Sequence, residues 1–158
     1  LMAGSIPMME IAMAAKGGDP EAVTGYALVL ASLMPGVAST GTSGHLRMQG
    51  NLVFRHAVEK LAQTAHHALE KAGLNPEHVD WLVPHQANMR IIESTAKRMQ
   101  LPMEKVVLTV ADHGNTSAAS IPLALSVANS EGRFKPGQIL VAEAIGGGLA
   151  WGSVVLRW

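Results

Sequence analysis

The chain has 158 residues, of which 48% are hydrophobic and 15% are charged. This length and balance are typical of a compact globular domain with its own core and argue against a disordered chain. Twelve basic side chains match twelve acidic ones, so no net charge favours a nucleic acid partner, and the lack of cysteine excludes disulfides, thiolate metal sites and a cysteine nucleophile within these residues.

The N-terminal segment predicts a buried helix rather than a membrane span. Its longest apolar stretch, residues 22–37, is interrupted by polar and helix-breaking residues and is shorter than the roughly 20 residues that a membrane helix needs. An aspartate followed by a proline predicts the start of a helix over residues 18–36. The chain begins at Leu1 and not at a methionine, so we expect its native start to lie upstream.

Beyond residue 50 the pattern alternates between amphipathic helices and short apolar strands. The strands are nearly continuous in apolar residues, which predicts an α/β fold with a mixed, mostly parallel sheet covered by helices on both faces. The last two strands are separated by a glycine-rich turn and are expected to form an antiparallel hairpin. We expect helices at residues 51–72, 88–99 and 117–132, and strands at residues 79–83, 105–110, 138–145 and 151–158.

Three loops follow the C-terminal ends of predicted strands, at residues 84–88, 112–120 and 146–148. Parallel strands bring such loops to one rim of a sheet, where α/β proteins gather their chemistry. His85 in the first loop can donate to a developing oxyanion or exchange a proton, Asn115 in the second offers an amide donor, and the glycines offer bare backbone N–H groups. Each loop alone also has an ordinary structural explanation as a hydrogen-bonding histidine, a helix cap or a tight turn.

Four stretches together resemble one enzyme family. They are GHLRMQGNLVFRHAV, WLVPHQANMRII, DHGNTSAASIPLAL and KPGQILVAEAIGGGLAWGSVVLRW. They are similar to the C-terminal half of β-ketoacyl-acyl-carrier-protein synthase III, a thiolase-fold enzyme of bacterial fatty-acid synthesis. The resemblance implies a condensing-enzyme C-terminal domain over residues 44–158, whereas residues 1–43 match no part of the family and stay unassigned, with a helix as their expected structure.

The resemblance also implies a role for each residue that matches a family motif. His85 and Asn115 match the pair that holds the malonyl thioester carbonyl while decarboxylation forms an enolate. Gly147 matches a glycine whose backbone N–H stabilises the later tetrahedral oxyanion. The substrates implied are malonyl-acyl-carrier-protein, which carries a phosphopantetheine arm, and a short acyl-CoA primer, with no cofactor besides these. The residues that match positions along the pantetheine arm are Gly50, Asn51 and Asn88.

A basic helix surface suggests a protein partner. Arg90 and Lys97 are seven residues apart and share a helix face, with Arg98 beside them. The family's equivalent helix docks the acidic acyl carrier protein, although a solvated helix face is the alternative and Glu93 dilutes the charge. The resemblance further implies a cytoplasmic enzyme that is a homodimer when intact, with neither a membrane nor a nucleic acid as partner.

The family's nucleophile is a cysteine in the N-terminal half, and these residues contain none. We therefore expect this chain not to carry out the full condensation alone. Three interpretations stay open: half of a synthase III enzyme, a relative that decarboxylates malonyl thioesters without acyl transfer, and a non-catalytic subunit that binds carrier protein. The histidines lack ligand spacing, so no metal site is expected. The acyl primer is not indicated, because the residues that shape its pocket belong largely to the other half.

Overall fold

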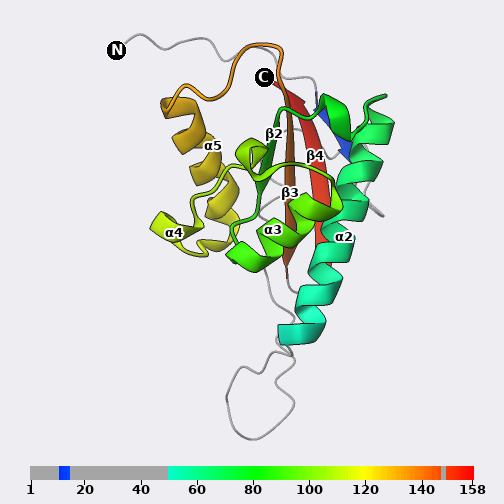
Figure 1. Cartoon of the computed structure of the whole chain (residues 1–158), viewed down its shortest axis with the longest axis vertical. Helices are drawn as coiled ribbons and strands as arrows, with labels where there is room; N and C mark the ends of the chain where they lie inside the picture. The colour runs from blue at the N-terminus through cyan, green and yellow to red at the C-terminus, as the bar shows by residue number, and fades with distance from the viewer. Residues whose placement is uncertain (1–10, 15–49, 147–148) are drawn as a thin grey trace, which may run out of the picture.

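The computed structural model describes residues 11–14, 50–146 and 149–158. The strands are β1 (Ile11–Ala14), β2 (Trp81–Pro84), β3 (Ile139–Gly146) and β4 (Ala150–Arg157). The helices are α2 (Gly50–Lys71), α3 (Met89–Arg98), α4 (Val110–His113) and α5 (Ser120–Ser130), with short 3-10 turns at Pro76–His78, Met103–Lys105 and Ser117–Ala119. The strands form one sheet in the order β1-β4-β3-β2, and helices cover both of its faces (Figure 1). This is the mixed α/β architecture that the sequence predicts.

The alternation of side chains along the strands decides which helix each face of the sheet contacts. Leu140 of β3 packs with α5, whereas its neighbour Val141 packs with α2 and α3. Strand β4 repeats the pattern with Leu156 on the α5 side and Val155 on the other. Because both faces are buried, the strands read as continuous apolar runs. The predicted hairpin is confirmed, since β3 and β4 pair antiparallel along their whole length.

Capping residues fix the helix ends close to their predicted positions. Helix α2 stops just before Gly73, whose φ of +69° is the left-handed conformation that favours glycine. Helix α3 starts after Asn88, whose side-chain oxygen accepts a hydrogen bond of 3.0 Å from the backbone N–H of Ile91. A 3-10 turn leads into α5, so the helix predicted from residue 117 begins at Ser120.

The strand predicted at residues 105–110 is wrong. The structure forms only one parallel bridge there, with Leu82 of β2. Beyond the bridge, the side chain of Gln86 takes the place of a neighbouring strand, because it donates to the carbonyl oxygen of Val107 (3.1 Å) and accepts from the N–H of Thr109 (2.9 Å). The segment therefore does not form a strand despite its strong β propensity, because the side chain of Gln86 forms hydrogen bonds that a neighbouring strand would otherwise form. Helix α4 follows directly.

The four described residues of the N-terminal segment form a strand, although we expect residues 1–43 to be helical. Strand β1 pairs antiparallel with β4, which places Ile11 opposite Leu156. The outer edge of β4 would otherwise present unpaired backbone groups, and β1 satisfies them. The helix predicted at residues 18–36 lies outside the described residues. Among the described strands the parallel pairing is β2 with β3, so the sheet is mixed without the expected excess of parallel pairs.

Candidate functional site

Segments distant in the sequence meet at the rim formed by the C-terminal ends of β2 and β3. These two strands are parallel and end at the same edge of the sheet. His85 extends their pairing by one residue, since its backbone N–H donates to the carbonyl oxygen of Glu143 at 2.7 Å. Ser120, at the start of α5, contacts the same place through hydrogen bonds to His85 and to the backbone N–H of Gln86. The first two predicted loops therefore lie against each other.

His85 is half-buried, and one hydrogen bond among the described residues holds its ring. Its Nδ1 lies 2.6 Å from the Oγ of Ser120. Burial lowers the pKa of His85 from its usual value, because desolvation disfavours the charged ring. The imidazole is therefore neutral at pH 7. Its Nε2 has no hydrogen-bond partner in the described part of the chain, which leaves this nitrogen available to a substrate.

Asn115 is exposed, and its own turn sets the orientation of its side chain. The Oδ1 atom accepts a hydrogen bond of 3.0 Å from the backbone N–H of Ser117. With the oxygen engaged, the amide NH₂ group has no partner among the described residues and is a free donor. Two left-handed residues shape the turn, Gly114 with a φ of +64° and Ser117 with a φ of +55°.

His85 and Asn115 thus present the same chemistry. Each uses one polar side-chain atom to bond the protein and keeps a nitrogen free; the amide NH₂ of Asn115 is a donor, and Nε2 of His85 is a donor when it carries the ring proton. Uncharged donors that are already oriented suit an oxygen that gains negative charge during a reaction. Gly147, which we expect to supply a further backbone donor, lies outside the described residues.

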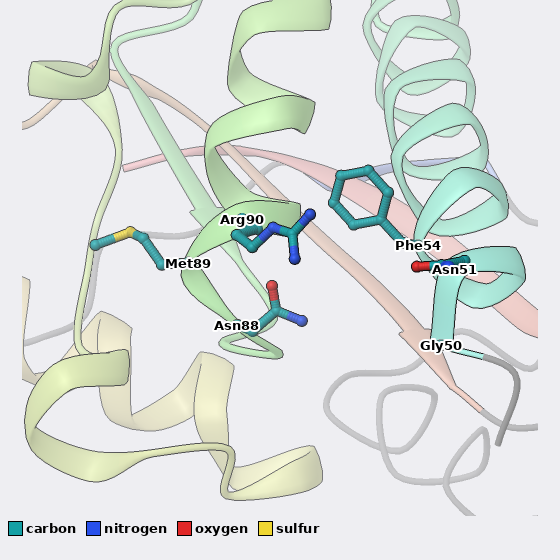
Figure 2. A pocket seen from close by; sticks show the side chains of 6 residues that line it. All are labelled: Gly50, Asn51, Phe54, Asn88, Met89 and Arg90. Atoms are coloured by element: carbon teal, nitrogen blue, oxygen red, sulfur yellow. The ribbon is translucent and has the colours of Figure 1, made fainter.

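An open pocket of about 530 Å³ lies between the N-terminal ends of α2 and α3 (Figure 2). Asn88, which follows His85 by three residues, lines this pocket. The guanidinium carbon of Arg90 lies 5.4 Å from the centre of the Phe54 ring, which is a cation–π contact across the pocket. All three residues that match the pantetheine arm line this one pocket. Its lining residues are Gly50, Asn51, Phe54, Asn88, Met89 and Arg90.

The predicted carrier-docking residues all lie exposed on α3. Arg90 lies at the pocket, whereas Lys97 and Arg98 lie in the last turn of the helix. Within the described ranges none of the three forms an ion pair, so their charges stay available to a partner. Glu93 is exposed between them and reduces the positive charge of this surface.

Sequence reasoning missed two residues that support the rim. Ser120 gave no signal, because its partner His85 precedes it by 35 residues. Gln86 is fully buried, and its side-chain amide joins the first loop to the segment before α4. The sequence shows that a glutamine follows the histidine, but it does not show where the glutamine amide points.

Glu143 was also missed, although the sequence carries a signal for it. It is the only charged residue in the apolar stretch QILVAEAI, and it is 1% exposed in β3. Both carboxyl oxygens lack a hydrogen-bond partner among the described residues, as does the buried hydroxyl of Ser153 opposite it on β4. Burial raises the pKa of Glu143 to about 8 by desolvation, so the group is protonated and neutral at pH 7.

No metal or membrane feature is found in the part of the chain that the structure describes. No group of histidine, aspartate and glutamate side chains there is placed to hold a metal ion. His66 and His67 are adjacent on α2 and therefore point in different directions. None of the helices in the described ranges combines the length and apolar character that crossing a membrane requires.

Comparison with known proteins finds relatives that cover most of the chain. The family described as 3-oxoacyl-[acyl-carrier-protein (ACP)] synthase III C terminal matches residues 69–158. The β-ketoacyl-[acyl-carrier-protein] synthase III of Paracoccus denitrificans is 89% identical over 123 residues, which are 78% of this chain and 38% of that protein. The enzyme of the same name from Cereibacter sphaeroides is 75% identical over the same shares.

Solved structures of enzymes with the same kind of name superpose on this chain. The crystal structure of 3-oxoacyl-[acyl-carrier-protein] synthase III from Aquifex aeolicus superposes with a TM-score of 0.74 at 38% identity, covering 94% of this chain and 43% of that one. The corresponding structure from Pseudomonas aeruginosa gives a TM-score of 0.72 at 35% identity. The thiolase-like fold is thereby confirmed, and the chain spans less than half the length of these relatives. The chain belongs to the C-terminal family of 3-oxoacyl-[acyl-carrier-protein] synthase III.

Proposed function

We propose that this chain supplies the malonyl-binding half of a β-ketoacyl-acyl-carrier-protein synthase III, which condenses malonyl-acyl-carrier-protein with a short acyl-CoA primer in fatty-acid biosynthesis. One observation carries the proposal: His85 and Asn115 each have one polar atom bonded to the protein and one nitrogen without a partner among the described residues. Such a pair can hold one thioester oxygen from two loops of the same rim.

In the proposed first step, the thioester oxygen of the malonyl group accepts hydrogen bonds from Nε2 of His85 and Nδ2 of Asn115. The bond to the carboxylate breaks, carbon dioxide leaves, and the electron pair stays on the α-carbon as an enolate. Negative charge reaches the oxygen only as this bond breaks, so the donors stabilise the transition state more than the ground state. A neutral imidazole suits this role, because a cationic one would also attract the malonyl carboxylate and stabilise the ground state.

In the proposed second step, the α-carbon attacks the acyl carbonyl carbon of a thioester on a cysteine of the other half of the enzyme. A tetrahedral oxyanion forms, and its collapse breaks the carbon–sulfur bond and releases the thiolate. The backbone N–H of Gly147 is the proposed donor to this oxyanion. The chain itself contributes no cysteine, so this step requires the other half.

The pocket between α2 and α3 is the proposed channel for the pantetheine arm. The arm carries amides, which need polar partners along an otherwise apolar wall. Asn51 and Asn88 supply side-chain amides, and the oxygen of Asn88 is already used by Ile91, so its NH₂ group is the part that faces a ligand. The Phe54 ring supplies apolar surface beside them.

An acidic acyl carrier protein is the proposed partner. Arg90, Lys97 and Arg98 are exposed, and Arg90 lies at the pocket through which the carrier's arm would enter. Complementary charge would steer the carrier so that its arm points into the pocket. The intact enzyme is proposed to be a homodimer in the cytoplasm.

A second candidate function is decarboxylation of malonyl thioesters without acyl transfer. The observation that favours it is that both proposed enolate donors lie in this chain, which has no cysteine. The two candidates differ in their products, because only condensation forms a β-ketoacyl thioester.

The test is to join residues 44–158 to the N-terminal half of the Paracoccus denitrificans enzyme and to supply malonyl-acyl-carrier-protein and acetyl-CoA. The proposal expects the joined enzyme to form β-ketoacyl product, while the 158-residue chain alone forms none. Carbon dioxide release by the chain alone would favour the second candidate. A folded, joined enzyme that forms no product and releases no carbon dioxide would contradict both.

A further inference from the structure

Among the described residues, the hydroxyl of Ser120 is the polar side-chain atom that forms a hydrogen bond with the ring of His85. It is 2% exposed, lies 2.6 Å from Nδ1 of His85, and accepts a hydrogen bond of 3.2 Å from the backbone N–H of Gln86. Bulk water therefore does not reach this hydroxyl, and its hydrogen bonds must come from the protein.

The number of available protons decides whether Ser120 or His85 donates in this hydrogen bond. The backbone N–H of Gln86 can only donate, so the oxygen of Ser120 is an acceptor there. The hydroxyl has one proton of its own, and Nδ1 of His85 is the only acceptor within its reach in the described part of the chain. If Nδ1 carried a proton instead, the hydroxyl proton would be buried without a partner, which is unfavourable.

We infer that Ser120 donates its hydroxyl proton to Nδ1 of His85 and thereby fixes the neutral ring with its own proton on Nε2, the nitrogen that faces a substrate. Ser120 is then a positioning residue, which makes His85 a donor and not an acceptor at the rim. The hydrogen-bond assignment stands on the geometry alone. Its catalytic meaning, that His85 always offers a proton to the thioester oxygen, rests on the proposed function.

The charged groups near His85 do not offer another explanation for a neutral ring. Helix α5 carries no ionisable side chain, and α4 carries Asp112 and His113, both exposed. On β3 the ionisable residue is Glu143, whose buried carboxyl is neutral at pH 7, and α3 carries Arg90, Glu93, Lys97 and Arg98, all exposed. Desolvation is the cause that lowers the pKa of His85, and the proposed donation to Nδ1 stabilises the same neutral form.

The experiment is nitrogen-15 NMR of the histidine rings in the 158-residue chain, recorded across a pH titration. In the wild type we expect the proton of neutral His85 on Nε2, with an Nδ1 resonance shifted by an accepted hydrogen bond. Ser120→Ala should remove that Nδ1 shift and let the proton of the neutral ring distribute over both nitrogens, because the bond that favours the proton on Nε2 is lost. Ser120→Thr keeps the hydroxyl and should restore both values.

The matched control is Ser126→Ala, which removes an exposed hydroxyl from the same helix and should change neither value. A wild-type ring with its proton on Nδ1 would overturn the inference even if Ser120→Ala does not fold. Unchanged nitrogen-15 shifts of the His85 ring in a folded Ser120→Ala would also overturn it, because that result means that Nδ1 accepts no hydrogen bond from the serine. These spectra need no substrate, so they fail or succeed independently of the proposed enzyme activity.

Discussion

The backbone N–H of Thr109 donates to the side-chain Oε1 of Gln86 at 2.9 Å, across 23 residues of sequence. The same amide group donates through Nε2 to the carbonyl oxygens of Pro84 and Val107. One fully buried side chain therefore completes three backbone hydrogen bonds where the sheet ends. It also ties the loop that contains His85 to the segment that leads to Asn115.

Replacing Gln86 with leucine should cost about 2–4 kcal/mol of unfolding free energy, because three buried backbone groups lose their partner at once. Amide hydrogen exchange should localise the effect, with faster exchange of the Thr109 N–H. The control is Gln63→Leu on α2, whose side-chain bonds are exposed and whose loss should cost less than about 0.5 kcal/mol. Equal urea midpoints for the two variants would contradict a supporting role for Gln86.

The buried Glu143 should make stability fall as pH rises. Its pKa in the folded protein is about 8, raised from 4.5, so the folded state binds more protons than the unfolded state between these values. The unfolding free energy should therefore decrease with pH in this window, by at most about 1.4 kcal/mol per pH unit. Glu143→Gln cannot ionise and should remove this slope.

Urea unfolding at pH 7 and pH 8 isolates the effect of Glu143. The lowered pKa of His85 gives a slope of opposite sign, but only below the ordinary histidine pKa of about 6.5. Glu104→Gln, at an exposed position, is the control and should keep the wild-type slope. If Glu143→Gln and the wild type lose the same stability between pH 7 and pH 8, the carboxyl is not buried in its neutral form.

The turn that holds Asn115 should depend on the glycine before it. Gly114 has a φ of +64° and a ψ of −161°, a conformation available almost only to glycine. Gly114→Ala should therefore cost at least about 1 kcal/mol of stability, measured by urea unfolding. Gly152→Ala is a matched control, because an added Cβ meets nothing within 4 Å at either glycine and Gly152 has no left-handed φ. A similar cost in both variants would remove backbone strain from the explanation.

Charge reversal on α3 should weaken binding of an acidic acyl carrier protein. Lys97→Glu and Arg98→Glu should lower the affinity of the joined enzyme for carrier at low salt, with a smaller difference at high salt where the charges are screened. Lys71→Glu makes the same charge change at the far end of α2 and should bind as the wild type does. Unchanged affinity of the α3 variants at low salt would exclude this surface as the docking site.

Periodicity and capping signals predicted most of the fold. The spacing of apolar residues in α2 and the start of a helix near Asn88 are local features, so the sequence shows them directly. The strand at residues 105–110 failed for a non-local reason. Its β-branched residues favour a strand, but the partner that they meet is the side chain of Gln86, which no pattern within the segment reveals.

The same distinction applies to the candidate site. His85 and Asn115 could be singled out from the sequence because both lie in stretches that resemble the family, and their roles stay predictions. The residues that orient them could not be predicted in the same way, since Ser120 acts on a ring 35 positions away and the Asn115 side chain is set by a turn with two positive φ angles. Glu143 lies between these cases, because a lone acidic residue in an apolar strand was visible but its burial was not.

The central claim is that His85 and Asn115 act as two donors to one enolate oxygen. In the joined enzyme, His85→Ala and Asn115→Ala should each lower malonyl decarboxylation by about 100-fold or more. Loading of the acyl group onto the cysteine should change much less, because that step forms no malonyl enolate. If the two donors act as a unit, the double variant should cost little beyond the more damaging single one.

The most direct measurement is carbon dioxide release from malonyl-acyl-carrier-protein, recorded separately from acyl loading in the same preparations. Our account predicts that release collapses in both variants while loading persists. Release at the parent rate in both variants would contradict it, and His85 would then be a structural histidine at the end of a strand.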